Sequence, residues 1–155
     1  MPELTVFASA LHALGAVIWV GGMFFAHQVL RPSLGAFEPP QRLTLWNAVF
    51  KRFFTLVWII VIAIPATGYW QVYTDFGSLE ESGHHVYTMN ITGLIMIGLF
   101  IFLYAVPYQK FKAAVEAEQW PVAGGHLNMI RRIVGINTIL GLITVVIGAS
   151  GRFWG

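Results

Sequence analysis

Four long apolar stretches are the feature of this sequence that most limits its fold. They cover about residues 6–28, 53–73, 86–107 and 130–149. Each holds roughly the 20 apolar residues that a helix needs to cross a bilayer core about 30 Å thick. The strands of a membrane barrel would alternate apolar and polar residues, and these stretches do not. Since lipid offers no partner for unpaired backbone groups, the stretches predict four membrane-spanning helices.

The composition excludes several other classes of protein. The chain is 57% hydrophobic and 10% charged, whereas a soluble domain carries about 25% charged residues. The lipid bilayer is therefore the expected partner. The absence of cysteine excludes disulfides, thiolate metal sites and covalent haem attachment. A net charge of only +2, with basic residues beside apolar spans, excludes a nucleic-acid partner.

The charges also orient the four spans. Both termini fall on one side, where the charged residues are Glu3, Asp75, Glu80, Glu81 and Arg152. The other side holds the remaining eight basic residues, which are Arg31, Arg42, Lys51, Arg52, Lys110, Lys112, Arg131 and Arg132. Basic residues mark the cytoplasmic side of a membrane protein. We therefore expect a multi-pass protein of a bacterial inner membrane with periplasmic N and C termini.

The predicted fold is all-α: a single antiparallel four-helix transmembrane bundle over residues 1–155, with helical extensions on the cytoplasmic side. Residues 41–50 follow Pro39 and Pro40 and lead into the second span. Residues 109–118 continue the third span, and Pro121 opens a helix that runs into the fourth. Proline suits a helix start because its missing N–H would be unpaired there.

Few polar residues lie inside the spans. All seven acidic residues lie outside them, which disfavours a proton-driven carrier. In the fourth span, Asn137, Gly141, Thr144 and Gly148 share one helix face. Such a face either packs closely against a neighbouring helix or leaves room for a flat cofactor.

His12 lies about two turns inside the first span. A histidine in hydrocarbon costs a few kcal/mol unless its ring nitrogens find partners. Two interpretations stay open. The ring can bond to Asn90, Asn137 or a backbone carbonyl, or it can be a ligand.

The other histidines lie at span ends. His84 and His85 begin the third span on the side of the termini, and His27 and His126 lie on the opposite side. The first and third spans are diagonal in an up-down bundle, so His12 and His85 can face each other across the interior, where bundles hold cofactors. His27 and His126 could form a second site.

Methionines accompany three of these histidines. Met23 and His27, and likewise His85 and Met89, are four residues apart and share a helix face, while Met129 follows His126 by three. Imidazole and thioether together suit Cu(I). Methionine is also a routine apolar filler.

Several stretches resemble the CopD-like membrane proteins. They are residues 11–25, 45–54, 85–89 and 130–137. The first of them carries the signature formed by His12, Trp19, Gly21 and Gly22. This family is similar to the HemJ-type protoporphyrinogen oxidases, which bind b-type haem through membrane histidines. The resemblance implies that His12 and His85 match the histidines of the first and third spans. The lysine that follows the latter in HemJ-type proteins is absent from residues 86–90.

The leading hypothesis is a haem b protein with His12 and His85 as axial ligands. Two histidines would give a low-spin, electron-transferring centre, so an electron carrier and an oxidoreductase both stay open. The redox partner is not identified. Arg152 would pair with a haem propionate. Asn137 would contact the cofactor from the small-residue face of the fourth span. Further candidate ligands are His84, His27, His126 and Met89.

Two alternatives belong to other classes. One is a copper-binding or copper-transporting protein, with Met23, His27, His85, Met89 and Met96 as ligands. The other is a cofactor-free structural subunit in which His12 only cross-links helices. Homo-oligomerisation is left open.

Overall fold

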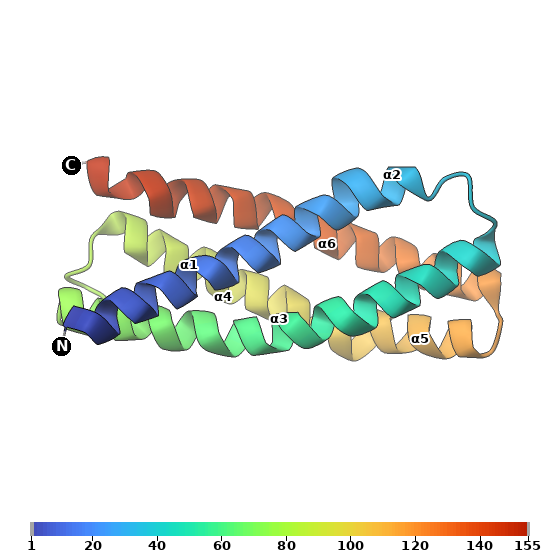
Figure 1. Cartoon of the computed structure of the whole chain (residues 1–155), viewed down its shortest axis with the longest axis horizontal. Helices are drawn as coiled ribbons and strands as arrows, with labels where there is room; N and C mark the ends of the chain where they lie inside the picture. Colours follow the sequence, from blue (N-terminus) through green and yellow to red (C-terminus); the bar gives the residue numbers. More distant parts are fainter. Residues whose placement is uncertain (1, 155) are drawn as a thin grey trace.

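The computed structural model describes residues 2–154 and consists of helical rods packed side by side (Figure 1). The first rod comprises α1 (Pro2–Phe25), a π-helical turn η1 (Ala26–Leu30) and α2 (Arg31–Ser33). The second is one helix, α3 (Pro39–Asp75). Both ends of the chain lie at the same end of the bundle (Figure 1), which we call the terminal end. The opposite end is called the basic end.

The second half of the chain forms the other two rods. The third rod comprises α4 (His84–Leu103), a π-helical turn η2 (Tyr104–Tyr108) and α5 (Gln109–Glu116). The fourth comprises α6 (Trp120–Ser150) and a 3₁₀ turn η3 (Gly151–Phe153). Within residues 2–154, four helices are long and apolar enough to cross a membrane. The predicted all-α fold with four spans is confirmed.

The rods are longer than the predicted spans because they continue at the basic end. α3 begins at Pro39, after an extended Glu38, where the fixed φ of proline is already helical. α5 continues the third rod to Glu116, and α6 begins at Trp120 with Pro121 in its first turn. The predicted helical extensions are therefore present, beyond the apolar windows.

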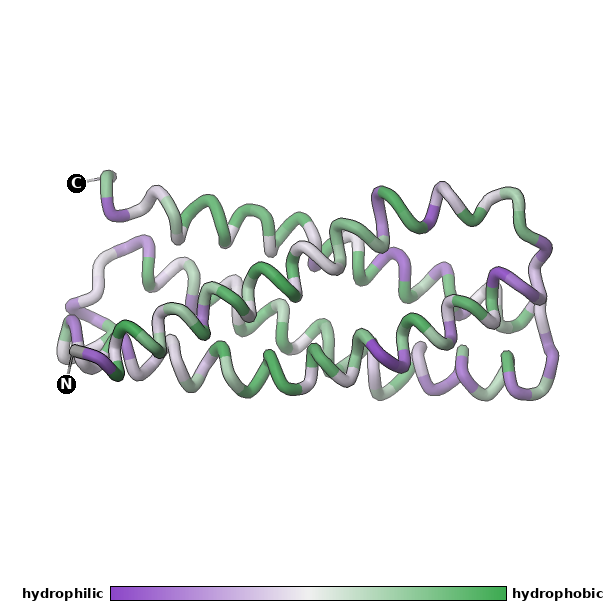
Figure 2. Tube along the Cα trace, in the orientation of Figure 1, coloured by the Kyte–Doolittle hydropathy of each residue, from purple (hydrophilic) through white to green (hydrophobic). Residues whose placement is uncertain are grey.

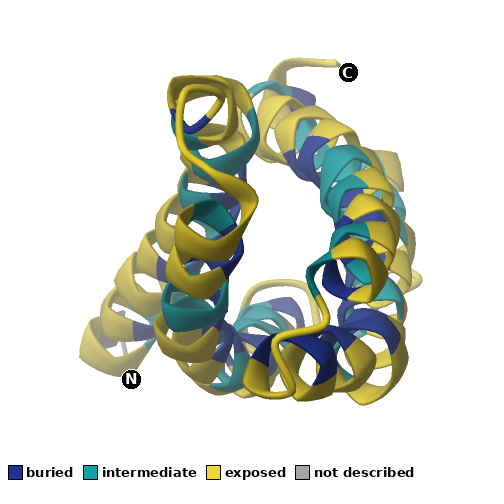
Figure 3. Cartoon of the chain, turned by 90° about the vertical axis from the view of Figure 1, so that its right-hand side faces the viewer, coloured by how far each residue is buried: buried dark blue, intermediate teal, exposed yellow. Residues whose placement is uncertain are grey.

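The outer surface is apolar over the middle of the bundle. The most apolar window of each rod is only 17% to 28% buried inside the protein. Exposed residues face outward all round the bundle (Figure 3), and hydrophobic residues dominate between the two more polar ends (Figure 2). Only lipid can remove so much apolar surface from water, because the chain does not bury it itself.

The four rods pack as two pairs. α1 packs most extensively against α3, and α4 against α6, while α1 also contacts α6. Among residues 2–154, α1 and α4 share no comparable contact, which places them diagonally across the bundle. This is the arrangement expected for the first and third spans.

Buried apolar side chains gather in the half toward the basic end. An aromatic stack on α3 runs through Trp46, Phe50 and Phe54, with ring centroids 5.1 Å and 5.0 Å apart. Tyr108 of η2 meets Phe54 edge-on at 4.9 Å. Such aromatic pairs contribute about 0.5–1.5 kcal/mol each beyond the area they bury.

The half toward the terminal end also contains polar contacts between the rods. Tyr69 Oη donates to Asn90 Oδ1 at 2.8 Å and joins α3 to α4. Ser9 Oγ donates to Gln71 Oε1 at 2.8 Å and joins α1 to α3. The core is therefore uneven along the bundle axis.

Candidate functional site

His12 is turned toward α3. Its Nδ1 lies 3.0 Å from the carbonyl oxygen of Ile64 and 3.1 Å from Thr67 Oγ1. A carbonyl can only accept, and Thr67 donates its own proton to the carbonyl of Ala63 at 2.6 Å. Nδ1 therefore carries the proton and Nε2 the lone pair. His12 thus cross-links α1 to α3 through a backbone carbonyl, one of the partners considered from the sequence.

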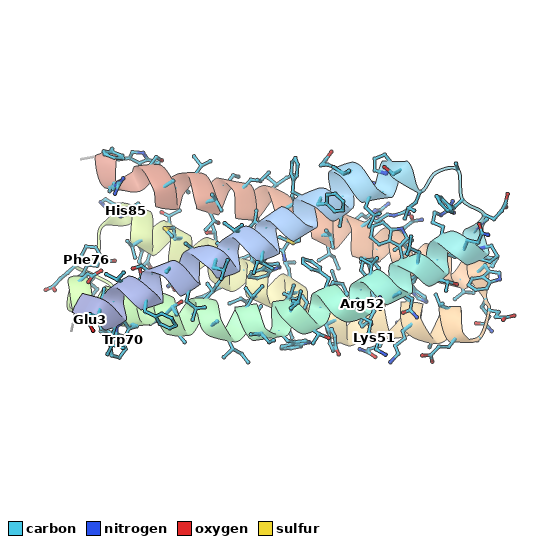
Figure 4. All side chains as sticks on the ribbon, viewed as in Figure 1. Glu3, Lys51, Arg52, Trp70, Phe76 and His85 are labelled. Atoms are coloured by element: carbon cyan, nitrogen blue, oxygen red, sulfur yellow. The ribbon has the colours of Figure 1, made fainter. Side chains whose placement is uncertain are left out.

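His85 is turned toward α6. A Cβ atom at Gly151 would overlap His85 Cβ and lie 2.6 Å from its Cγ, so α4 and the end of α6 meet here without a gap. His84 is exposed beside it. Figure 4 shows His85 at the end of the bundle that also holds Glu3 and Phe76.

No contact among the described residues joins His12 to His85. One ring packs on α3 and the other beside Gly151. The predicted bis-histidine pair therefore has no support in the structure. Arg152 follows Gly151 and is exposed, with its guanidinium 4.7 Å from the centroid of the Phe153 ring.

The small-residue face of α6 packs against α4. Asn137 Nδ2 donates to the carbonyl of Met96 at 3.1 Å, and Thr144 Oγ1 donates to Thr92 Oγ1 at 2.7 Å. Gly148 lies against Met89. Of the two interpretations of this face, close helix packing describes the contacts seen.

Successive glycines of α6 and η3 each lie against a side chain with a soft donor atom. A Cβ at Gly148 would lie 3.2 Å from Met89 Sδ, whereas one at Gly141 would lie 2.8 Å from Val20 Cγ2 and 3.1 Å from the methyl carbon Cε of Met96. At Gly135 it would lie 3.2 Å from His27 Nε2. His85 faces Gly151 in the same way. The groups that face the fourth rod are therefore, in order, the imidazole of His85, the thioethers of Met89 and Met96, and the imidazole of His27.

Met23 lies between Met96 and His27 in this series. It is 3% exposed and lines an apolar cavity of about 290 Å³, together with Trp19, Phe100 and Asn137. Asn137 Oδ1 is buried and has no hydrogen-bond partner among the described residues. We call the full series the donor row; it consists of His85, Met89, Met96, Met23 and His27.

The donor row extends over most of a membrane. Gly151 and Gly135, which face its two ends, are 16 residues apart in sequence, or about 24 Å along a helix at 1.5 Å per residue. A bilayer core is about 30 Å thick. Four of the five side chains named from the sequence as copper ligands therefore face the rod formed by α6 and η3, which spacing alone did not establish.

A second cavity lies at the basic end, on the side where the sequence suggested a second site with His27. Its volume is about 490 Å³, and it is lined by His27, Gln28, Arg31, Pro32, Gly35, Arg42 and Arg131. The arginines come from three different rods. No spacing signal in the sequence marks their convergence.

His126 does not join His27 in a site within the described residues. His126 lies in α6 nine residues before Gly135, the position that contacts His27. Between residues 2 and 154, no three His, Cys, Asp or Glu side chains are grouped closely enough to hold a metal ion. Any metal bound in the bundle would therefore rely on methionine sulfur as well as imidazole.

The fold defines the class of protein. It is a polytopic α-helical membrane protein. The chain belongs to the CopD family, copper resistance protein D, whose family model matches residues 47–150. That range holds His85, Met89 and Met96 but not α1. No curated protein and no solved structure matches the chain.

Proposed function

We propose that this protein binds Cu(I) and passes it across the membrane along the donor row. The observation that carries the proposal is the sequence of contacts along α6, in which Gly151, Gly148, Gly141 and Gly135 face His85, Met89, Met96 and His27. The name of the family, copper resistance protein D, agrees with this choice of metal.

The donor chemistry selects the metal. Thioether sulfur and imidazole nitrogen suit Cu(I), whereas Mg²⁺ and Ca²⁺ require oxygen ligands such as carboxylates. None of the seven acidic residues lies within the four apolar stretches. A hard divalent cation would therefore find few suitable ligands in the interior of the bundle.

The spacing suits movement more than storage. Along α6, the glycines that face the donors are three, seven and six residues apart, or about 4.5, 10.5 and 9 Å. Conduction requires sites strong enough to admit an ion and weak enough to release it. Donors spread along the helix supply a series of weak sites instead of one closed cage.

Asn137 supports a cation in the apolar cavity beside Met23. Its Oδ1 is buried without a partner and its side chain lines the cavity that holds Met23. A buried acceptor without a partner costs about 1–3 kcal/mol. A cation beside this oxygen would recover part of that cost, which an apolar occupant would not.

Exchange of His85 for alanine is expected to weaken Cu(I) binding about tenfold or more, the scale at which metal sites respond to lost support. Affinity is measured on purified protein by competition with a Cu(I) chelator. The control is His84→Ala, because His84 is the exposed neighbour and lies outside the donor row. Equal affinities of the two variants would contradict the placement of the row.

Haem b is the second candidate, and His12 is the observation that favours it. Its Nδ1 is held by Ile64 and Thr67, the kind of support that fixes a metal-ligating histidine, with Nε2 left as the ligand atom. However, the residues do not fit a haem macrocycle between His12 and His85. The small-residue face of α6, which would have to leave room for the macrocycle, is packed against α4. The spectrum of purified protein from haem-rich cells decides: a Soret band that shifts on reduction would establish haem, and its absence would reject haem.

The orientation of the bundle is part of the proposal. The basic end carries most of the positive charge, which places it in the cytoplasm. A reporter enzyme that works only in the periplasm is therefore expected to be active when it is fused after the C-terminal residue. Fusion of the same reporter between α2 and α3 serves as the control and should give no activity. The reverse pattern would overturn the orientation.

A further inference from the structure

The cavity at the basic end and the apolar cavity are lined by neighbouring residues at the end of the first rod. Ala26 and Leu30 line the apolar cavity, while His27 and Arg31, which follow them in sequence, line the polar one. α2, which begins with Arg31, lies at the end opposite the termini (Figure 1). A cationic opening of about 490 Å³ thus lies beside an apolar space of about 290 Å³.

The polar cavity has an unbalanced positive charge. Arg31, Arg42 and Arg131 line it, and no acidic residue does. The hydrogen bonds of Arg42 and Arg131 go to neutral groups, the carbonyl of Phe37 at 3.3 Å and Asn128 Oδ1 at 3.4 Å. Three cations around one cavity repel one another unless an anion lies among them.

Arg131 supplies a second, independent indication of a ligand. Its Nε is buried and has no hydrogen-bond partner among the described residues. A guanidinium offers five donors in a planar fork that matches phosphate and carboxylate oxygens. A phosphate oxygen in the cavity would satisfy Nε and balance the charge together.

The geometry points to an anionic phospholipid as the ligand of this site. Its phosphate would lie among Arg31, Arg42 and Arg131, and one acyl chain would lie along the rim of the apolar cavity, beside the partly exposed Phe25 and Phe53. Basic pockets between transmembrane helices recognise anionic lipid headgroups in this way. A free inorganic anion would use the polar cavity alone and leave the apolar cavity unexplained.

This inference goes beyond the movement of Cu(I), because the lipid is held whether or not copper is present. The arginines belong to α2, α3 and α6, so the bound headgroup would join three of the four rods at the basic end. Bound lipid would therefore stabilise the bundle as any ligand of the folded state does.

The test is native mass spectrometry of the whole protein in neutral detergent without copper. Phosphatidylglycerol and phosphatidylcholine with identical acyl chains are added in parallel, and inorganic phosphate is added as a third arm. We expect the protein to retain phosphatidylglycerol, and Arg131→Gln to weaken its binding roughly fivefold, the effect of removing one cation near an anionic lipid. Arg132→Gln is the matched control, since Arg132 is exposed and does not line the cavity.

The outcomes separate the proposal from its alternatives. Equal retention of the two lipids, or equal losses in Arg131→Gln and Arg132→Gln, would show unspecific attraction and overturn it. Displacement of the lipid by millimolar inorganic phosphate would leave only a simple anion site. If Arg131→Gln does not fold, Arg42→Gln on α3 takes its place, and unchanged retention of phosphatidylglycerol by that variant rejects the site.

Discussion

Protein with Met96→Leu, reconstituted into vesicles, is expected to move Cu(I) at least about tenfold more slowly than the wild type. Met96 is 3% exposed and lies against Gly141 in the middle of the donor row. Leucine has a similar size but no sulfur, so the variant removes one donor and keeps the packing. A tenfold slower rate corresponds to a barrier higher by about 1.4 kcal/mol. The measurement is the initial rate of Cu(I) accumulation, read by a chelator trapped inside the vesicles.

The control for this experiment is Met129→Leu. Met129 lies on α6, is 48% exposed and is outside the donor row. The chemical change is the same, and volume-conserving apolar exchanges cost less than about 1.5 kcal/mol, so both variants should fold. Equal rates for the two variants would mean that Cu(I) does not pass Met96, and the proposed path would be wrong.

Gly151→Ala is expected to destabilise the protein by about 2 kcal/mol or more. The new Cβ would overlap the Cβ of His85, and neither atom can turn away because both are fixed to the backbone. The ends of α4 and α6 must therefore move apart, and overpacking of this kind costs about 1–3 kcal/mol. Gly151 has φ −58° and ψ −30°, which alanine adopts freely, so backbone strain does not contribute. The readout is the midpoint of thermal unfolding in detergent.

Gly98→Ala provides the matched comparison. Gly98 lies inside α4, and a Cβ there meets nothing within 4 Å. Alanine is preferred to glycine in a helix by roughly 0.5–1 kcal/mol, so this variant should be as stable as the wild type or more so. Similar losses in both variants would show that the contact between Gly151 and His85 is not tight.

The spans and their extensions could be predicted because membrane physics acts on each of them separately. A helix must satisfy its own backbone in lipid, so length and hydropathy are sufficient. Pro39, Pro40 and Pro121 mark helix starts for a local steric reason. These signals need no knowledge of the neighbouring rods.

The rotation of each rod about its axis could not be predicted. Lipid and the bundle interior are both apolar, so a spanning helix has little contrast between its faces. The sequence placed His12 and His85 on the same side of the membrane, but it could not show that His12 turns to Ile64 and His85 to Gly151. Contacts between small residues decide that rotation, and they depend on the partner helix.

The π-helical turns add a further obstacle. η1 (Ala26–Leu30) lies between Met23 and Arg31, and a π turn places i,i+5 instead of i,i+4 residues in line. The four-residue spacing of Met23 and His27 therefore overstated how directly the two face the same way. The convergence of Arg42 and Arg131 with Arg31 depends on this turn and on two other rods, so no local pattern indicates it.

Because the core is uneven, the two ends of the bundle differ in the free energy needed to separate the rods. The free energy needed to open a region follows the apolar contacts that it buries, and these are concentrated around Phe50 and Phe54. Toward the other end, the α1–α3 pair and the α4–α6 pair are joined by contacts such as the hydrogen bond between Tyr69 and Asn90. Spreading the two pairs there costs less than spreading them at the aromatic end. The rods are therefore expected to separate more easily at the terminal end, where His85 begins the donor row, than around the aromatic stack.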